Sequence, residues 1–253
     1  MDTKLWVFGD SFAYGWIDEK VKDERVGYSW PTVLYKSVQE NTDYNAKHIV
    51  KYCQLGIDIH TVIETFISNL YLVNEDDFVI LMLPTTARAR FPVNERWGAH
   101  HTDKEQKFNA FSFDGFNKLN ETPDFTKVVN EPFNNMSYKD FKNIAETIMY
   151  INSSEEEIDS VNKILYSLKK IVKFPIYIMS WTDELDSTIV DTKSVLTEGI
   201  GHWKTLNDLY YSGDRDKGVK GDGHWSEEMQ IDVADYIIKK YPSYFKGEVN
   251  DIL

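Results

Sequence analysis

Four short apolar runs, separated by longer segments with helical periodicity, constrain the fold of this chain more than any other feature. Runs of this length and character are typical of strands buried on both faces of a parallel sheet. Helices that alternate with such strands cover the two faces of the sheet. The four predicted strands are Leu5–Phe8, His48–Tyr52, Phe78–Leu83 and Phe174–Trp181.

The segments between these runs carry apolar residues at the spacing of an amphipathic helix, and serines stand where two of the helices would begin. Ser154 and Ser226 are the expected N-caps, because a serine side chain accepts a hydrogen bond from a free N–H of the first turn. We therefore predict a three-layer α/β/α fold in a single domain of residues 1–253. The predicted helices are Tyr28–Gln39, Thr61–Leu72, Ser137–Tyr150, Glu155–Val172 and Ser226–Tyr241.

Residues 92–136 show no sustained periodicity and contain several prolines, asparagines and aromatic residues. The segment is too long for an ordinary connection between two elements of a compact domain. We interpret it as an insertion after the third strand that covers the functional site as a lid.

Ser11 stands where the first apolar run ends, in the sequence Gly9-Asp10-Ser11. Near the other end of the chain, Asp222 and His224 directly precede the last predicted helix. A serine, a histidine and a carboxylate are the nucleophile, base and orienting group of serine-dependent catalysis. A serine N-cap or a surface histidine is common by itself, but the two motifs together favour catalysis.

Several candidate residues follow the ends of different predicted strands. In a parallel sheet these ends lie at one edge, where ligands of open α/β sheets bind. The strand pattern alone therefore predicts a functional site at this edge. The residues are Ser11, Gly56, Thr85 and Trp181.

The motifs Gly9-Asp10-Ser11-Phe12 and Asp222-Gly223-His224-Trp225 resemble the first and last blocks of the SGNH (GDSL-type) hydrolase family. They are most similar to a subgroup of bacterial and phage genomes that carries Gly-Asp-Ser-Phe and Asp-x-His-Trp. The resemblance spans the chain in islands and leaves about residues 92–140 without a counterpart. It implies a flavodoxin-like fold with Ser11 as nucleophile, His224 as general base and Asp222 as its partner, and it requires no metal or organic cofactor.

The resemblance also implies an oxyanion hole built from the loops after the first three strands. The backbone N–H groups of Ser11 and Gly56 are two expected donors. The loop after the third strand lacks the asparagine common in the family. The subgroup tends to have a Thr/Ser–Pro–x–Arg stretch there, so Thr85 is the candidate for the third donor. Arg88, in the same loop, and Trp225, next to the histidine, are candidate substrate contacts.

The aspartate stands two residues before His224, whereas three is the commonest spacing in the family. We expect Gly223 to let the chain curl back so that Asp222 reaches the imidazole, because glycine tolerates positive φ. Asp214 and Asp216 are the alternative partners of the histidine.

Composition limits the partners of the chain. With 28 Lys and Arg against 41 Asp and Glu, the net charge is −13, which disfavours nucleic acid. No apolar run approaches the ~18 residues of a membrane span, and no secretory signal precedes the first strand. The single cysteine, Cys53, fits a reducing compartment. From these observations we expect a cytoplasmic protein.

The adjacent His100 and His101 do not have metal-ligand spacing, so no metal site is predicted.

These observations predict a serine-dependent hydrolase that acts on an acyl or acetyl ester of a small molecule or carbohydrate through an acyl-enzyme. Two alternatives stay open. The same triad serves an O-acyltransferase, in which an alcohol replaces water as the acceptor. The other alternative is a non-catalytic binding protein on the same scaffold, which the missing asparagine supports and the intact Ser11, His224 and Asp222 argue against. The oligomeric state is not predicted.

Overall fold

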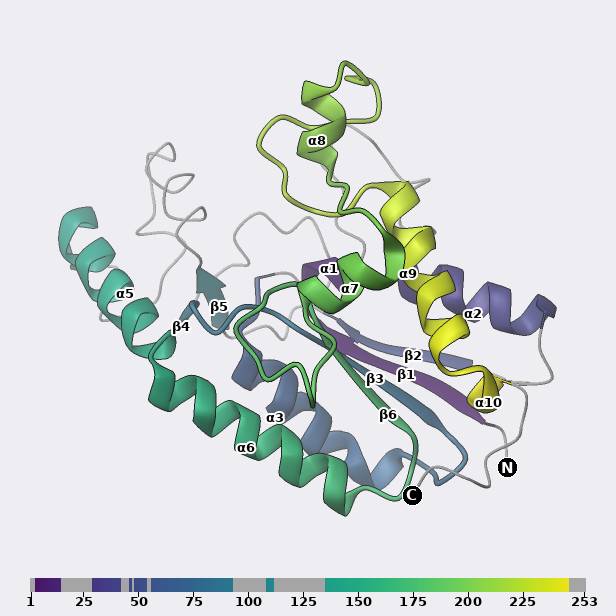
Figure 1. The fold of residues 1–253 in the computed structure, drawn as a ribbon. Coiled ribbons are helices and arrows are strands. Elements are labelled where there is room, and N and C mark those ends of the chain that lie inside the picture. The colour runs from purple at the N-terminus through teal and green to yellow at the C-terminus, as the bar shows by residue number, and fades with distance from the viewer. Residues whose placement is uncertain are drawn as a thin grey trace.

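A parallel sheet between two layers of helices forms the centre of the molecule in the computed structural model (Figure 1). The structure describes residues 3–14, 29–41, 46, 48–53, 56–92, 108–111 and 135–245. Within these residues the sheet has four strands in the order β2-β1-β3-β6. The predicted three-layer α/β class is therefore confirmed. The strands are β1 (Lys4–Gly9), β2 (His48–Cys53), β3 (Phe78–Leu83) and β6 (Ile176–Ser180).

Alternation of side chains along each strand builds two separate cores. In β1, Leu5 and Val7 belong to one core, whereas Trp6 and Phe8 belong to the other. β3 divides in the same way, since its residues are all buried and alternate between the two cores. This double burial explains why the strands appear in the sequence as continuous apolar runs.

Each core is closed by its own set of helices. α2, α9 and α10 cover one face of the sheet, and α3 and α6 cover the opposite face (Figure 1). The helices are α1 (Ser11–Tyr14), α2 (Trp30–Asn41), α3 (Ile59–Asn69), α5 (Tyr138–Asn152), α6 (Glu155–Ile171), α7 (Lys193–Ile200), α8 (Leu206–Tyr211), α9 (Glu227–Lys240) and α10 (Pro242–Phe245), with a 3₁₀ turn, η2 (Leu70–Leu72), after α3.

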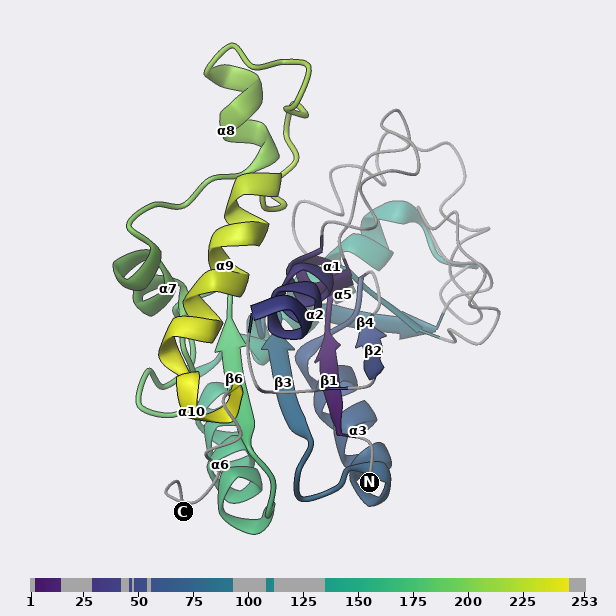
Figure 2. The same ribbon diagram turned by 90° about the vertical axis from the view of Figure 1, so that its right-hand side faces the viewer.

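All four strands point the same way, and their carboxyl ends lie at the end of the sheet where α1 and α8 are found (Figure 2). In the order β2-β1-β3-β6 the direction of winding changes between β1 and β3. Ligands of doubly wound sheets bind beyond the strand ends at such a switch point. Ser11 lies just beyond the end of β1 at this switch point, because it is the first residue of α1.

Serine and aspartate caps set the beginnings of the long helices. Ser154 and Ser226 accept the N–H groups of Glu157 and Met229, so both predicted caps are confirmed. α3 begins two residues earlier than predicted, because Asp58 caps it by accepting from the N–H of Thr61.

Several short elements were not predicted. α7, α8 and α10 are each eight residues or fewer, too short for a clear apolar period. Most of the predicted insertion, residues 92–136, lies outside the described residues. Its described part includes β5 (Phe108–Phe111), which pairs antiparallel with β4 (Ala89–Pro92) in a second sheet. The prediction of a lid therefore stays a prediction.

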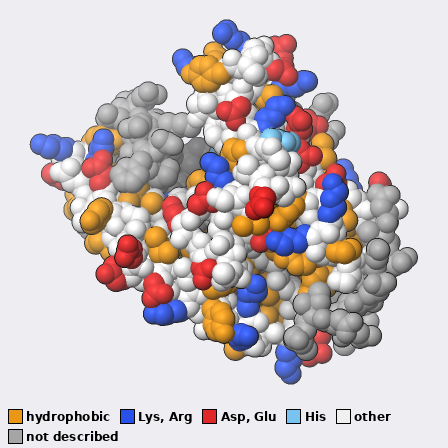
Figure 3. Space-filling view, viewed as in Figure 1, with side chains coloured by type: hydrophobic (Ala, Val, Ile, Leu, Met, Phe, Trp, Pro, Cys, Tyr) orange, Lys and Arg blue, Asp and Glu red, His pale blue; other side chains and the backbone are white. Residues whose placement is uncertain are grey.

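On the face shown in Figure 3, acidic and basic side chains are interspersed, with apolar side chains between them. In the part of the chain that the structure describes, no helix combines the length and the apolar character needed to cross a bilayer.

Candidate active site

The turn from β1 into α1 places Ser11 at the carboxyl edge of the sheet. A Cβ atom on Gly9 would lie 2.8 Å from the Cβ of Ala13 and 2.9 Å from the Cβ of Met82, so only glycine fits where the strand bends into the helix. The Asp10 carbonyl accepts the N–H groups of Ala13 and Tyr14. The Asp10 carboxylate accepts the N–H of Phe12 at 3.1 Å. These contacts fix the backbone on both sides of Ser11.

Asp222 and His224 lie together in the loop before α9. One oxygen of Asp222, Oδ1, is 2.9 Å from the backbone N of His224 and 2.6 Å from its Nδ1. The carboxylate therefore curls back toward His224 and accepts both its backbone N–H and its ring nitrogen with the same oxygen. The left-handed glycine of this turn is Gly221, with φ 76°. The expectation that Gly223 supplies the positive φ is wrong, because the curl lies in the Asp222 side chain.

The loop that carries these residues is held by the N-terminus of α8. The N–H of Leu206 donates to the carbonyl of His224 at 2.9 Å, and the N–H of Asn207 donates to the carbonyl of Asp222 at 2.8 Å. The alternative partner Asp214 forms an ion pair with Lys217 instead. The backbone on both sides of the imidazole is thus anchored to a neighbouring element.

The imidazole connects the two ends of the chain. His224 Nε2 lies 2.8 Å from Ser11 Oγ, and the Phe12 ring packs 5.0 Å from the imidazole, centroid to centroid. Ser11 and Asp222 are buried and His224 is half-buried. With the Nδ1 proton directed at Asp222, Nε2 is left to accept the serine proton. This arrangement can activate a serine hydroxyl at a partly desolvated position.

Gly56 follows β2, the neighbour of β1 in the sheet, and its φ of 59° is left-handed. Glycine is the residue that adopts this conformation without strain. Two residues later Asp58 caps α3. Gly56 therefore lies at the same edge of the sheet as Ser11, and its role as an oxyanion donor stays a prediction.

The Thr85 hydroxyl is engaged by protein groups. It donates to Glu184 Oε1 and accepts the N–H of Ala87 at 3.1 Å. Glu184 also accepts the N–H and the hydroxyl of Thr86 through its other oxygen. Because a hydroxyl has one proton, this geometry favours a structural role for Thr85 over the predicted one as an oxyanion donor.

The two predicted substrate contacts are both buried. Arg88 is 8% exposed, and its guanidinium bonds to the Ile57 carbonyl and to Asp10. Trp225 is 3% exposed and packs edge-on against Phe12 and Trp203. Burial of this kind favours supporting roles over direct contact with a substrate.

Sequence reasoning missed the partners of Asp10 and of Thr85. Trp181 Nε1 donates to Asp10 Oδ2 at 3.0 Å, and Arg88 Nη2 lies 3.2 Å from the same oxygen. The signal available in the sequence was position: Trp181 directly follows β6, and Arg88 lies in the loop after β3. Glu184 carries no comparable signal, since it lies in an irregular loop after β6.

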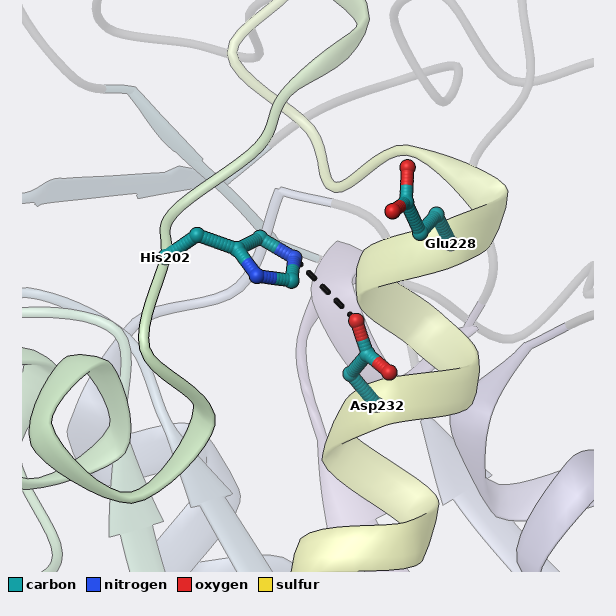
Figure 4. Close-up of side chains that lie close together, drawn as sticks. All are labelled: His202, Glu228 and Asp232. Carbon is teal, nitrogen blue, oxygen red and sulfur yellow. Dashed lines mark ion pairs between the residues drawn. The ribbon is translucent and has the colours of Figure 1, made fainter.

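Among the residues that the structure describes, one group of side chains outside this site has metal-ligand chemistry. His202, Glu228 and Asp232 lie close together near the start of α9 (Figure 4). His202 Nε2 is 3.1 Å from Asp232 Oδ2, and Glu228 is paired with Lys204. The ion pairs already compensate these charges, and an ammonium on Glu228 competes with any cation. We therefore assign no metal to this group.

Comparison with known proteins gives only distant similarity. No protein-family model matches the chain, and no curated protein does. Two catalytic mutants of Axe2, an acetylxylan esterase from Geobacillus stearothermophilus, align at 11% and 10% identity with TM-scores of 0.42 and 0.41, over 95% of both chains. A member of the lipolytic protein G-D-S-L family from Veillonella parvula aligns at 12% identity and a TM-score of 0.32, over 95% of this chain and 98% of that one. We draw neither family membership nor activity from likeness at this level.

Proposed function

We propose that this chain is a serine-dependent ester hydrolase of the SGNH (GDSL) type, acting on an acyl or acetyl ester of a small molecule or carbohydrate. The observation that carries the proposal is the continuous set of hydrogen-bond distances from Ser11 Oγ through His224 to Asp222. The three residues come from opposite ends of the chain and converge at the carboxyl edge of the sheet. The resemblance of the two sequence motifs to the first and last blocks of this family supports the same conclusion.

In the first step, Ser11 Oγ attacks the acyl carbon of the ester while His224 Nε2 takes the hydroxyl proton. The imidazolium that forms is stabilised by Asp222 at Nδ1. The tetrahedral intermediate then collapses, its bond to the alcohol oxygen breaks, and His224 returns the proton to the departing alcohol. An acyl-Ser11 ester remains.

The negative charge of the intermediate requires donors aimed at the carbonyl oxygen. The N–H groups of Ser11 and Gly56 are the proposed donors, because the two residues lie shortly after the ends of the neighbouring strands β1 and β2. Both are backbone groups, so their position depends on how the two loops are held relative to each other.

In the second step, His224 removes a proton from water as the water oxygen attacks the acyl carbon. The second tetrahedral intermediate expels Ser11 Oγ, which regains the proton from His224. The products are a carboxylic acid and the original enzyme, so no further reactant is needed.

The proposal is tested by hydrolysis of p-nitrophenyl acetate with wild type, Ser11→Ala and Ser167→Ala. Ser167 is exposed on α6, where its hydroxyl bonds to the Lys163 carbonyl, so its loss is a matched control. We expect Ser11→Ala to lose turnover while its circular dichroism and melting temperature remain those of wild type. Wild-type turnover in a folded Ser11→Ala protein would exclude the serine mechanism.

A further inference from the structure

Arg88 is a buried arginine that connects three loops at the carboxyl edge of the sheet. It belongs to the loop after β3, and its Nη1 donates to the carbonyl of Ile57 in the loop after β2. Its Nη2 lies 3.2 Å from Asp10 Oδ2, at the turn after β1. The two ends of one guanidinium group thus hold two different loops.

The backbone of Arg88 is itself fixed. Its carbonyl accepts the side-chain amide of Asn152, at the end of α5, at 2.7 Å. Its N–H donates to the carbonyl of Thr86 at 2.7 Å. The guanidinium group also lies over the ring of Trp181, 5.6 Å from the centroid. Arg88 is therefore a rigid connection between the loops it joins.

The residues that Arg88 holds are the sequence neighbours of the two proposed oxyanion donors. Asp10 directly precedes Ser11, and Ile57 directly follows Gly56. A shift of either contact would change the separation of the two N–H groups. A lysine in place of Arg88 would have no second set of donors with fixed geometry.

A gain in stability does not by itself account for this pair. Asp10 is fully buried, and a buried ion pair is often no more stable than apolar side chains of similar volume. The Asp10 carboxylate instead fixes the positions of the groups around it, because it accepts from Phe12 N–H, Trp181 Nε1 and Arg88 at once.

We infer that Arg88 is a positioning residue that sets the separation of the Ser11 and Gly56 N–H groups, and so the oxyanion hole. The inference rests on the proposed function. Because the donors act mainly on the transition state, loss of Arg88 lowers kcat and leaves KM nearly unchanged. Misplacement by about 1 Å at a reacting centre costs on the order of 100-fold in rate.

The experiment compares Arg88→Lys with Arg90→Lys. Arg90 is two residues away and exposed, and it contacts Thr61 and Glu64 on α3 and the cap of that helix, Asp58, at 3.8 Å. Arg90→Lys therefore removes a guanidinium group from the same segment without touching Asp10 or Ile57. The assays are kcat and KM for p-nitrophenyl acetate, inhibition by phenylboronic acid, and the melting temperature. Phenylboronic acid bonds to the serine oxygen and presents an anionic tetrahedral group to the oxyanion donors.

We expect Arg88→Lys to lower kcat by about 10- to 100-fold with KM within about threefold, and to weaken phenylboronic acid binding by about tenfold or more. Arg90→Lys should leave kcat, KM and phenylboronic acid binding within about twofold of wild type. A lower melting temperature with wild-type kcat would make Arg88 only structural and overturn the inference. A raised KM with wild-type kcat would make it a substrate contact and also overturn it.

If Arg88→Lys does not fold, Trp181→Phe replaces it. This change removes one donor to Asp10 and keeps a ring beside Phe12. A kcat reduced by about three- to tenfold with unchanged KM supports the inference, and an unchanged kcat overturns it. Wild type that neither hydrolyses esters nor binds phenylboronic acid contradicts the proposed function and this inference together, whereas an active wild type with an equally active Arg88→Lys contradicts the inference alone.

Discussion

Asp222 Oδ1 accepts both the backbone N–H of His224 at 2.9 Å and its Nδ1–H at 2.6 Å. One oxygen thus fixes the backbone of the histidine and the orientation of its ring. Because the Nδ1 proton is held there, the lone pair on Nε2 faces Ser11. The short spacing between aspartate and histidine is sufficient for this geometry, since the carboxylate curls back over the chain.

Asp222→Asn should reduce kcat by about 10²- to 10⁴-fold. An amide in place of the carboxylate stabilises the imidazolium poorly and favours the wrong tautomer. The control is Asp214→Asn, which removes a carboxylate paired with Lys217 in the same part of the chain. Steady-state kinetics of the two variants measure the difference. Full activity in a folded Asp222→Asn protein would exclude Asp222 as the partner of His224.

Thr85→Val should lower the free energy of unfolding by about 1–3 kcal/mol, because Glu184 loses a hydrogen-bond donor in a partly buried position. We expect kcat to fall by less than about tenfold, since the hydroxyl proton is used by Glu184 rather than by a substrate. Thr147→Val, on the exposed surface of α5, is the control for the substitution itself. A 100-fold loss of kcat without loss of stability would instead make Thr85 an oxyanion donor.

Gly9→Ala should destabilise the fold by at least about 1–3 kcal/mol. The added Cβ would lie within 3.0 Å of the Cβ atoms of Ala13 and Met82, both in the buried core. Gly223→Ala is the matched control for stability, because a Cβ there meets nothing within 4 Å. Urea denaturation gives both values. Equal stability of the two variants would contradict the close approach of β1, β3 and α1.

The free energy of unfolding should fall on the alkaline side. Burial raises the pKa of Cys53 to about 12, and burial followed by the charge of Asp191 raises the pKa of Tyr177 well above its ordinary value. Both groups are neutral when folded and ionise more easily when unfolded. Their contribution is therefore complete below the unfolded pKa values, about 8.5 and 10, and is lost as pH rises toward the folded values.

Urea denaturation from about pH 8 to about pH 11 measures this loss. Tyr177→Phe should make stability less dependent on pH across that range, because the buried phenol no longer ionises on unfolding. Tyr71→Phe is the control, since Tyr71 is 83% exposed. If wild type keeps its full stability to about pH 11, these two groups are not buried as neutral species.

The class of the fold was predictable because burial on both faces makes each central strand a continuous apolar run. Phe78–Leu83 is the clearest case, with all six residues buried. The caps Ser154 and Ser226 were predictable for a local reason, since a cap depends on residues within one turn. α7 and α8 were not predictable, because they are short and their positions depend on distant segments. α7 packs against α9, and α8 bonds to the loop before α9.

The candidate site was predictable in its residue types but not in its connections. Ser11 and His224 were singled out by motifs, and the 2.8 Å between them is a product of the whole fold. The roles of Arg88 and Glu184 depend on contacts across more than thirty and more than ninety positions. No local pattern in the sequence encodes contacts of that range.

The most direct measurement for the central claim is labelling with a fluorophosphonate near neutral pH, followed by mass spectrometry of the peptides. An activated serine is phosphonylated rapidly, whereas ordinary serines are not. We predict that wild type is modified at Ser11, that His224→Ala is modified much more slowly, and that Ser11→Ala is not modified at all. A folded wild type that is not modified, or that is modified at another serine, would contradict the claim that Ser11, His224 and Asp222 form a catalytic triad.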